Sequence, residues 1–144
     1  LSKEYVDWEH LIEMQSSRVL SIESHTFNSH YMVSEKEGTH AALTSRIPLP
    51  NGKLENYDDY KNRVYNDLKL SKEVLEKNLN KKVQFLSVPF GNANKEVREI
   101  SSELGFKAVF SSGGGINELP LETWNIKRIT LTKDDKLEDL LFWF

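Results

Sequence analysis

The sequence predicts an α/β fold in which a parallel β-sheet is covered by helices. The first observation is a set of short apolar runs typical of strands, at residues 19–23, 82–88, 106–110 and 124–131. The second is that helical periodicity occupies most of the segments between these runs. Strands that alternate with helices usually pair in parallel and bury the helices against the sheet. A chain of 144 residues has the size of one domain, so we expect residues 1–144 to form a single unit.

The first helix is expected at the N-terminus, starting near Ser2 and ending at Ser16 and Ser17. Its apolar stripe consists of Tyr5, Trp8, Leu11 and Ile12. We therefore expect Trp8 in the core. His10 lies off this stripe and is expected to be solvated.

Residues 57–80 are expected to form one long amphipathic helix. Apolar residues recur along it at three- and four-residue steps, at Tyr60, Val64, Leu68, Val74 or Leu75, and Leu79. The adjacent carboxylates Asp58 and Asp59 suit its first turn, where the helix dipole favours negative charge. Asp59 is also expected to pair with Arg63 one turn later.

The strand at residues 82–88 must end at Pro89, which has no N–H group to donate to a sheet. Asn94 then caps a helix that runs through Leu104, and Gly105 terminates it. The last expected strand, residues 124–131, contains Arg128. A final helix is expected to start at Asp134 or Asp135 and to end in the apolar residues 140–144.

The composition is that of an ordinary globular protein, with 38% apolar and 28% charged residues. A net charge of −3 provides no electrostatic attraction for nucleic acid or for an anionic membrane. The chain has no cysteine, so a thiolate zinc site is excluded. No apolar run approaches the roughly 20 residues of a membrane span. The chain starts at Leu1 with helix-like sequence at once, and we expect it to be a piece of a longer polypeptide.

Two histidines, His25 and His30, stand five positions apart just after the strand-like residues 19–23. Neutral imidazoles are good ligands for zinc and other first-row metals. Residues five apart diverge on a continuous helix, but a bend at Asn28 and Ser29 lets them converge. The alternative is an exposed polar loop.

The polar residues 34–40 include a candidate for a third metal ligand. His40 ends this expected loop, and it is either that ligand or an exposed histidine. Arg46 begins a loop with two prolines and an Asn-Gly turn. It is either a contact for an anionic or hydroxylated ligand or a surface charge.

In parallel sheets, functional residues usually lie at the carboxyl ends of the strands. Residues 25–30 and residues 89–94 both follow expected strands, so we expect them to share one site. Gly91 permits a positive φ or a close backbone approach there.

The chain resembles the polysaccharide deacetylase domain (NodB homology, carbohydrate esterase family 4). Residues 24–30, Ser-His-Thr-Phe-Asn-Ser-His, are similar to the second motif of that family, and residues 87–92, Ser-Val-Pro-Phe-Gly-Asn, to its third. The helix at residues 60–79 resembles the one that precedes the third motif. The five-residue histidine spacing and the Arg46 loop are closest to the branch that deacetylates poly-N-acetylglucosamine of biofilm matrix. The resemblance covers the C-terminal two-thirds of the domain and implies a partial, distorted (β/α) barrel whose first strands are missing.

The resemblance implies a zinc-dependent, extracytoplasmic enzyme, secreted or on the cell surface, that removes N-acetyl groups from a polysaccharide. His25, His30 and an aspartate would hold zinc or another divalent first-row metal, which would polarise the acetamide carbonyl and a water. A second carboxylate would act as general base. Pro89, Phe90 and Gly91 would line the groove, with the Phe90 N–H helping to hold the oxyanion. The implied contacts with substrate are Arg46, Phe90, Asn92 and Trp124.

The chain departs from the family pattern because nothing before Trp8 matches its Asp-Asp motif. Asp58–Asp59 and Asp134–Asp135 are adjacent pairs, but both stand at expected helix starts. No histidine follows His40, so the late catalytic histidine of many members is also absent. These departures leave open a catalytically silent, carbohydrate-binding relative, and also a structural α/β module with coincidental histidines. Self-association is expected if the first strands are missing.

Overall fold

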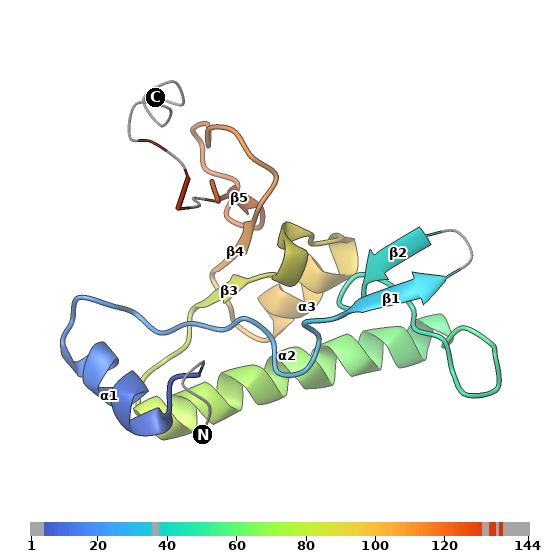
Figure 1. The fold of residues 1–144 in the computed structure, drawn as a ribbon, viewed down its shortest axis with the longest axis horizontal. Helices are drawn as coiled ribbons and strands as arrows, with labels where there is room; N and C mark the ends of the chain where they lie inside the picture. The colour runs from blue at the N-terminus through green and yellow to red at the C-terminus, as the bar shows by residue number, and fades with distance from the viewer. Residues whose placement is uncertain (1–4, 36–37, 131–132, 135, 137–144) are drawn as a thin grey trace.

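The fold is that of a computed structural model in which residues 5–35, 38–130, 133, 134 and 136 are described. A small parallel sheet has the order β3 (Phe85–Ser87), β4 (Ala108–Ser111) and β5 (Ile126–Lys127). The long helix α2 (Tyr57–Leu79) extends across the molecule below the sheet, and α3 (Lys95–Glu103) lies beside it (Figure 1). The expected α/β class with a parallel sheet is confirmed. Within the described residues the sheet is open and does not close into a barrel.

Helix α2 begins and ends where its sequence predicts. The Asn56 side chain accepts a hydrogen bond from the Asp59 N–H at 2.8 Å, and Asn80 ends the helix in the left-handed conformation with φ of 49°. Its buried residues are Tyr60, Val64, Leu68, Ser71 and Leu79. The expected apolar stripe therefore faces the core.

Helix α3 is also confirmed. Asn94 caps it by accepting the Val97 N–H at 3.0 Å. The Asn94 amide donates to the Tyr60 hydroxyl at 2.7 Å and to the Thr44 carbonyl at 3.1 Å, so this one side chain joins both helices to the chain that precedes α2. Within the described residues the buried core cluster consists of Leu43, Tyr60, Val64, Leu68, Val83, Leu86, Val88, Ala93, Val97, Ile100, Phe106 and Val109.

The expected strand at residues 19–23 is wrong, since only Ser24 pairs with the sheet. Ser24 forms a parallel bridge with Leu86, in which the Ser87 N–H donates to the Ser24 carbonyl at 2.9 Å. Immediately before it, the Glu23 carboxylate accepts the Lys81 ammonium at 2.6 Å and the Gln84 N–H at 2.8 Å. Burial alone would raise the pKa of Glu23, but the Lys81 ammonium and the backbone N–H donors outweigh it and hold the pKa below its usual value. The Glu23 side chain thus accepts the N–H group that the backbone of a strand at residues 19–23 would otherwise pair with.

The loop expected at residues 34–40 is wrong for its described residues, because β1 (Met32–Glu35) and β2 (Gly38–Ala41) pair as antiparallel strands. Among the described residues of the two strands, Val33 and Ala41 are buried. The sequence is otherwise mostly polar, so it does not show the apolar alternation that predicts a strand. Helix α1 (Trp8–Ser16) starts after its cap Asp7 rather than near Ser2, which lies outside the described residues.

Trp8 is 41% exposed, which contradicts its expected place in the core. α1 contributes no buried residue and no member of the core cluster. The last strand is only two residues long, and the expected helix up to Phe144 lies mostly outside the described residues. No helix in the described part of the chain is long and apolar enough to cross a membrane.

Candidate functional site

His25 and His30 are brought together. Their ring centroids are 5.0 Å apart and the rings are tilted by 60°. His25 stands where the strand pairing of Ser24 with Leu86 ends, so the edge of the sheet fixes its position. Two imidazoles bound to one tetrahedral zinc at Zn–N distances of about 2.0–2.1 Å have ring centres roughly 5 Å apart. The separation therefore fits a shared metal ion.

The hydrogen bond of His25 determines which of its nitrogens is free. Its Nδ1 lies 2.6 Å from the Ser87 carbonyl oxygen, which can only accept, so Nδ1 carries the proton. The Nε2 lone pair then remains available to a metal, as in protein zinc sites where the second nitrogen is held by a carbonyl. His30 is stabilised differently, because its ring stacks on Phe90 with centroids 4.9 Å apart and an angle of 26°.

Residues 89–91 form a short 3₁₀ turn beside the histidines, so the two expected site segments meet. Pro89 is buried, whereas Phe90 is 47% exposed and adopts a positive φ of 55°. A bulky residue in the left-handed region is strained, and such strain clusters at functional sites. The conformation presents the Phe90 ring to His30.

The loop between the histidines depends on residues outside it. Thr26 has a positive φ of 74°, and Ser29 is buried. The N–H groups of Phe27 and Asn28 both donate to the Asp67 carboxylate on α2. Asp67 is a site residue that sequence reasoning missed, since a contact across about 40 residues leaves no local pattern.

Arg46 is exposed at the head of a loop that a buried ion pair holds in place. Arg63 Nε lies 2.9 Å from Glu55 Oε1, and the Arg63 Nη2 donates to the Ser45 carbonyl at 2.9 Å. On the other side of Arg46, the Ile47 N–H donates to Glu55. The expected Asp59–Arg63 pair is wrong, because Asp59 instead bonds to the Asn56 amide.

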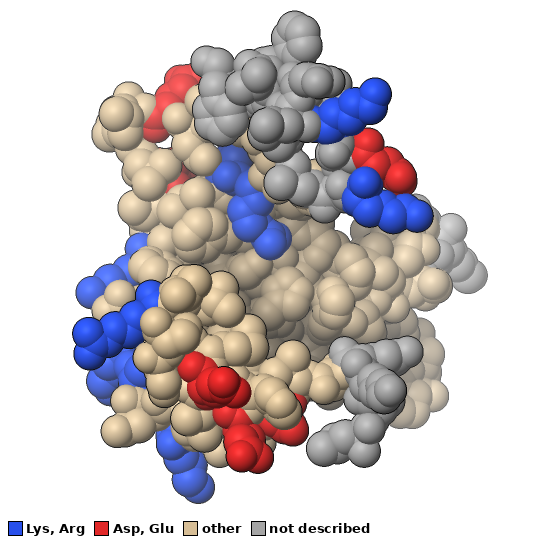
Figure 2. Space-filling view, turned by 60° about the vertical axis from the view of Figure 1, so that its left-hand side comes forward, with Lys and Arg blue, Asp and Glu red and all other residues tan. Residues whose placement is uncertain are grey.

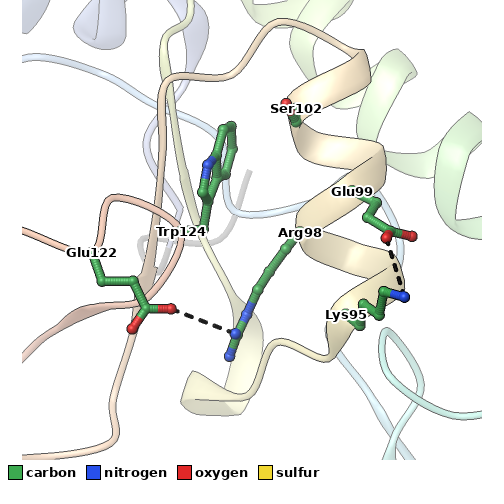
Figure 3. Close-up of a pocket in the computed structure, with 6 residues that line it drawn as sticks. All are labelled: Lys95, Arg98, Glu99, Ser102, Glu122 and Trp124. Carbon is green, nitrogen blue, oxygen red and sulfur yellow. Dashed lines mark ion pairs between the residues drawn. The ribbon is translucent and has the colours of Figure 1, made fainter.

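Trp124 is not brought to the histidines. It lies against α3 and lines a separate pocket of about 390 Å³ together with Lys95, Arg98, Glu99, Ser102 and Glu122 (Figure 3). The carbonyl of the preceding Thr123 accepts the Val109 N–H, in the middle of β4, whereas the histidines follow the carboxyl end of the sheet. Asn92 follows the 89–91 turn and is exposed, which leaves it accessible beside Phe90.

No third ligand joins the histidine pair within the described residues, where no group of three His, Cys, Asp or Glu side chains suited to a metal occurs. His40 lies on β2 opposite Val33, and its side chain is exposed. Asp58 and Asp59 occupy the first turn of α2, as expected for helix-start carboxylates. Of the other pair, Asp135 lies outside the described residues.

Figure 2 shows a face whose middle is formed by uncharged residues, with most of the charged side chains around its edge.

The polysaccharide deacetylase family model matches residues 2–109 of the chain. No curated protein sequence matches it significantly. Among solved structures, the BpsB deacetylase domain from Bordetella bronchiseptica is 27% identical with a TM-score of 0.80, and the match covers 86% of this chain and 48% of that one. A de-N-acetylase from Aggregatibacter actinomycetemcomitans is 23% identical with a TM-score of 0.87, covering 97% of this chain and 53% of the other.

A third similar structure is IcaB from Ammonifex degensii, with 22% identity, a TM-score of 0.71 and coverage of 89% of this chain and 48% of that one. The last two likenesses, at such low identity, establish the fold only. The chain spans about half the length of these structures. The family match covers well over half of the chain, so the protein belongs to the polysaccharide deacetylase family.

Proposed function

We propose that this chain is part of a metal-dependent enzyme that hydrolyses N-acetyl groups of an N-acetylglucosamine-containing polysaccharide. Poly-N-acetylglucosamine is favoured over peptidoglycan or chitin because the histidine spacing, the Arg46 loop and the helix at residues 60–79 together resemble the branch that deacetylates it. The observation that carries the proposal is the pairing of His25 and His30 at 5.0 Å, with Nε2 of His25 left free by the bond to Ser87. The family match and the similarity to a structure named as a deacetylase domain support the same chemistry.

His25 and His30 would hold the metal, for which zinc is the commonest choice with imidazole ligands. A bound zinc would supply Lewis acidity toward the acetamide carbonyl and a water. The Ser87 carbonyl keeps His25 in the tautomer that presents Nε2. Phe90, stacked on His30, would limit motion of that ring and form one wall of the groove.

Substrate contacts are proposed for two exposed side chains, Arg46 and Asn92, and for the backbone of Phe90. The Arg46 guanidinium and the Asn92 amide would bind sugar hydroxyl or acetamide groups, and the backbone N–H of Phe90 would bind the oxyanion. Trp124 is left out, because it lines the pocket against α3.

The remaining groups of a deacetylase site are a third ligand and a general base. We propose that a part of the domain that this chain does not span supplies them and completes a distorted (β/α) barrel. We also propose an extracytoplasmic location, because the substrate polysaccharides lie there. The lack of a third ligand among the described residues favours one alternative, a catalytically silent relative that binds carbohydrate.

The test is acetate release from N-acetylglucosamine oligomers by the full gene product loaded with zinc. The His25→Ala/His30→Ala variant is expected to lose more than about 100-fold in rate, since loss of outer-shell partners alone costs 10–100-fold. His40→Ala is the matched control, because that exposed histidine lies on β2. Glycan binding without acetate release by the unaltered protein would instead establish the silent relative.

A further inference from the structure

We propose that Asp67 is a positioning residue, whose carboxylate clamps the loop between His25 and His30 and thereby sets the approach of the two imidazoles. The inference rests on the proposed metal site and adds to it a residue on α2 that is far from the histidines in sequence.

The clamp has two points of attachment. One Asp67 carboxylate oxygen accepts the Phe27 N–H at 3.1 Å, and the other accepts the Asn28 N–H at 2.7 Å. Both N–H groups belong to the middle of the loop. Hydrogen bonds to an ionised acceptor are about twice as strong as neutral ones, and two of them fix the orientation of the loop as well as its position.

The loop needs an external support because its own conformation is unfavourable. Thr26 is β-branched, yet its φ is 74°, a region that such residues rarely occupy. Its hydroxyl oxygen is buried and has no hydrogen-bond partner within the described part of the chain. Strained backbone of this kind persists only where the surroundings hold it. The two bonds to Asp67 directly follow Thr26 and provide that hold.

Asp67 belongs to a polar stripe on α2, formed by Arg63, Asp67 and Ser71. Residues four apart share one face of a helix, and each of these three holds a different segment of the site. Arg63 binds the chain on either side of Arg46 through Glu55 and Ser45. The Ser71 hydroxyl bonds to the Ser24 hydroxyl, immediately before His25. One rigid helix thus supports the loop at its start and in its middle.

A positioning role and a purely structural role differ in what they change. If Asp67 only stabilised the fold, its loss would lower the melting temperature and leave the metal affinity of the folded protein unaltered. If it sets the approach of the imidazoles, affinity falls even where the protein remains folded. The variant Asp67→Asn keeps the size of the side chain, but one of its two acceptors becomes an NH₂ group that faces an N–H.

The experiment is a titration of the metal-free chain with Zn²⁺ and, for its visible spectrum, with Co²⁺. Asp67→Asn is expected to bind at least about tenfold more weakly than the unaltered chain, the lower end of outer-shell effects. Glu73→Gln is the control for loss of one negative charge from α2, since Glu73 is exposed and only 3.9 Å from Lys69 in a surface pair. It is expected to bind within about twofold of the unaltered chain.

Amide hydrogen exchange of the metal-free protein tests the clamp independently of metal. The Phe27 and Asn28 N–H groups are expected to be protected in the unaltered chain and exposed to exchange in Asp67→Asn. Equal metal affinity in the two proteins, or unprotected amides in the unaltered chain, would overturn the inference even if the variant folds poorly. If the unaltered chain shows the protection pattern but binds no metal, Asp67 holds the loop and it is the proposed metal site of this chain that fails.

Discussion

Replacement of Arg63 by methionine is expected to lower the free energy of unfolding by about 3–5 kcal/mol, the cost of leaving one partner of a buried ion pair alone. The Glu55 side chain is only 3% exposed and that of Arg63 is 23% exposed. Both Glu55 oxygens lie within 3.1 Å of Arg63 Nε, so the carboxylate would lose its main partner and stay desolvated. The Ser45 carbonyl would lose its donor as well.

The effect is best measured by urea unfolding at pH 7, with a variant of a second paired arginine as the control. Arg98→Met removes a pair with Glu122 at 3.7 Å whose side chains are 35% and 65% exposed, and it is expected to cost below about 1 kcal/mol. The double variant Glu55→Gln/Arg63→Met is expected to lose less than the sum of its single changes, because the two residues act as a unit. A loss of under 1 kcal/mol in Arg63→Met would show that the pair does not hold the Arg46 loop.

Gly91→Ala is expected to destabilise the turn beside His30 by about 2–5 kcal/mol, from a left-handed backbone cost of about 1–2 and overpacking of about 1–3. Gly91 has a φ of 70°, and an added Cβ would overlap the Ser112 side chain and lie 2.7 Å from Ser112 N. The Ser112 side chain can rotate its hydroxyl away, but its backbone nitrogen cannot move without displacing the end of β4. The change is therefore expected to displace Phe90 and weaken the metal site.

A change at a second glycine separates the backbone cost from the overpacking cost in the loss of stability. Gly52 has a φ of 77°, but an added Cβ there would meet nothing within 4 Å. Gly52→Ala is expected to cost only the backbone part, about 1–2 kcal/mol. Thermal and urea unfolding of both variants gives the difference. Equal losses in the two would contradict the close approach of Gly91 to Ser112.

The parts of the fold that could be predicted are those with local signals. α2 and α3 have Asn caps, Asn56 and Asn94, and apolar residues at helical spacing, so their limits came within a residue or two. The meeting of residues 25–30 with residues 89–91 followed from the rule that strand ends gather at one edge of a parallel sheet.

The parts that escaped prediction depend on contacts between distant residues. Charged residues one helical turn apart often form ion pairs, which made Asp59 the expected partner of Arg63. The actual partner is Glu55, which precedes the helix. Asp67 reaches its loop across about 40 residues. The positive φ of Thr26 and Phe90 has no signal in the sequence, because neither residue type prefers that conformation.

The proposed metal site requires that His25 and His30 bind one metal ion. The decisive measurement is the zinc affinity and stoichiometry of the purified chain beside its His25→Ala/His30→Ala and His40→Ala variants. We expect one zinc per chain, bound weakly because two ligands are few, retained in His40→Ala and lost in the double variant. Zinc binding that survives in the double variant, or no binding by the unaltered chain, would contradict the proposed metal site.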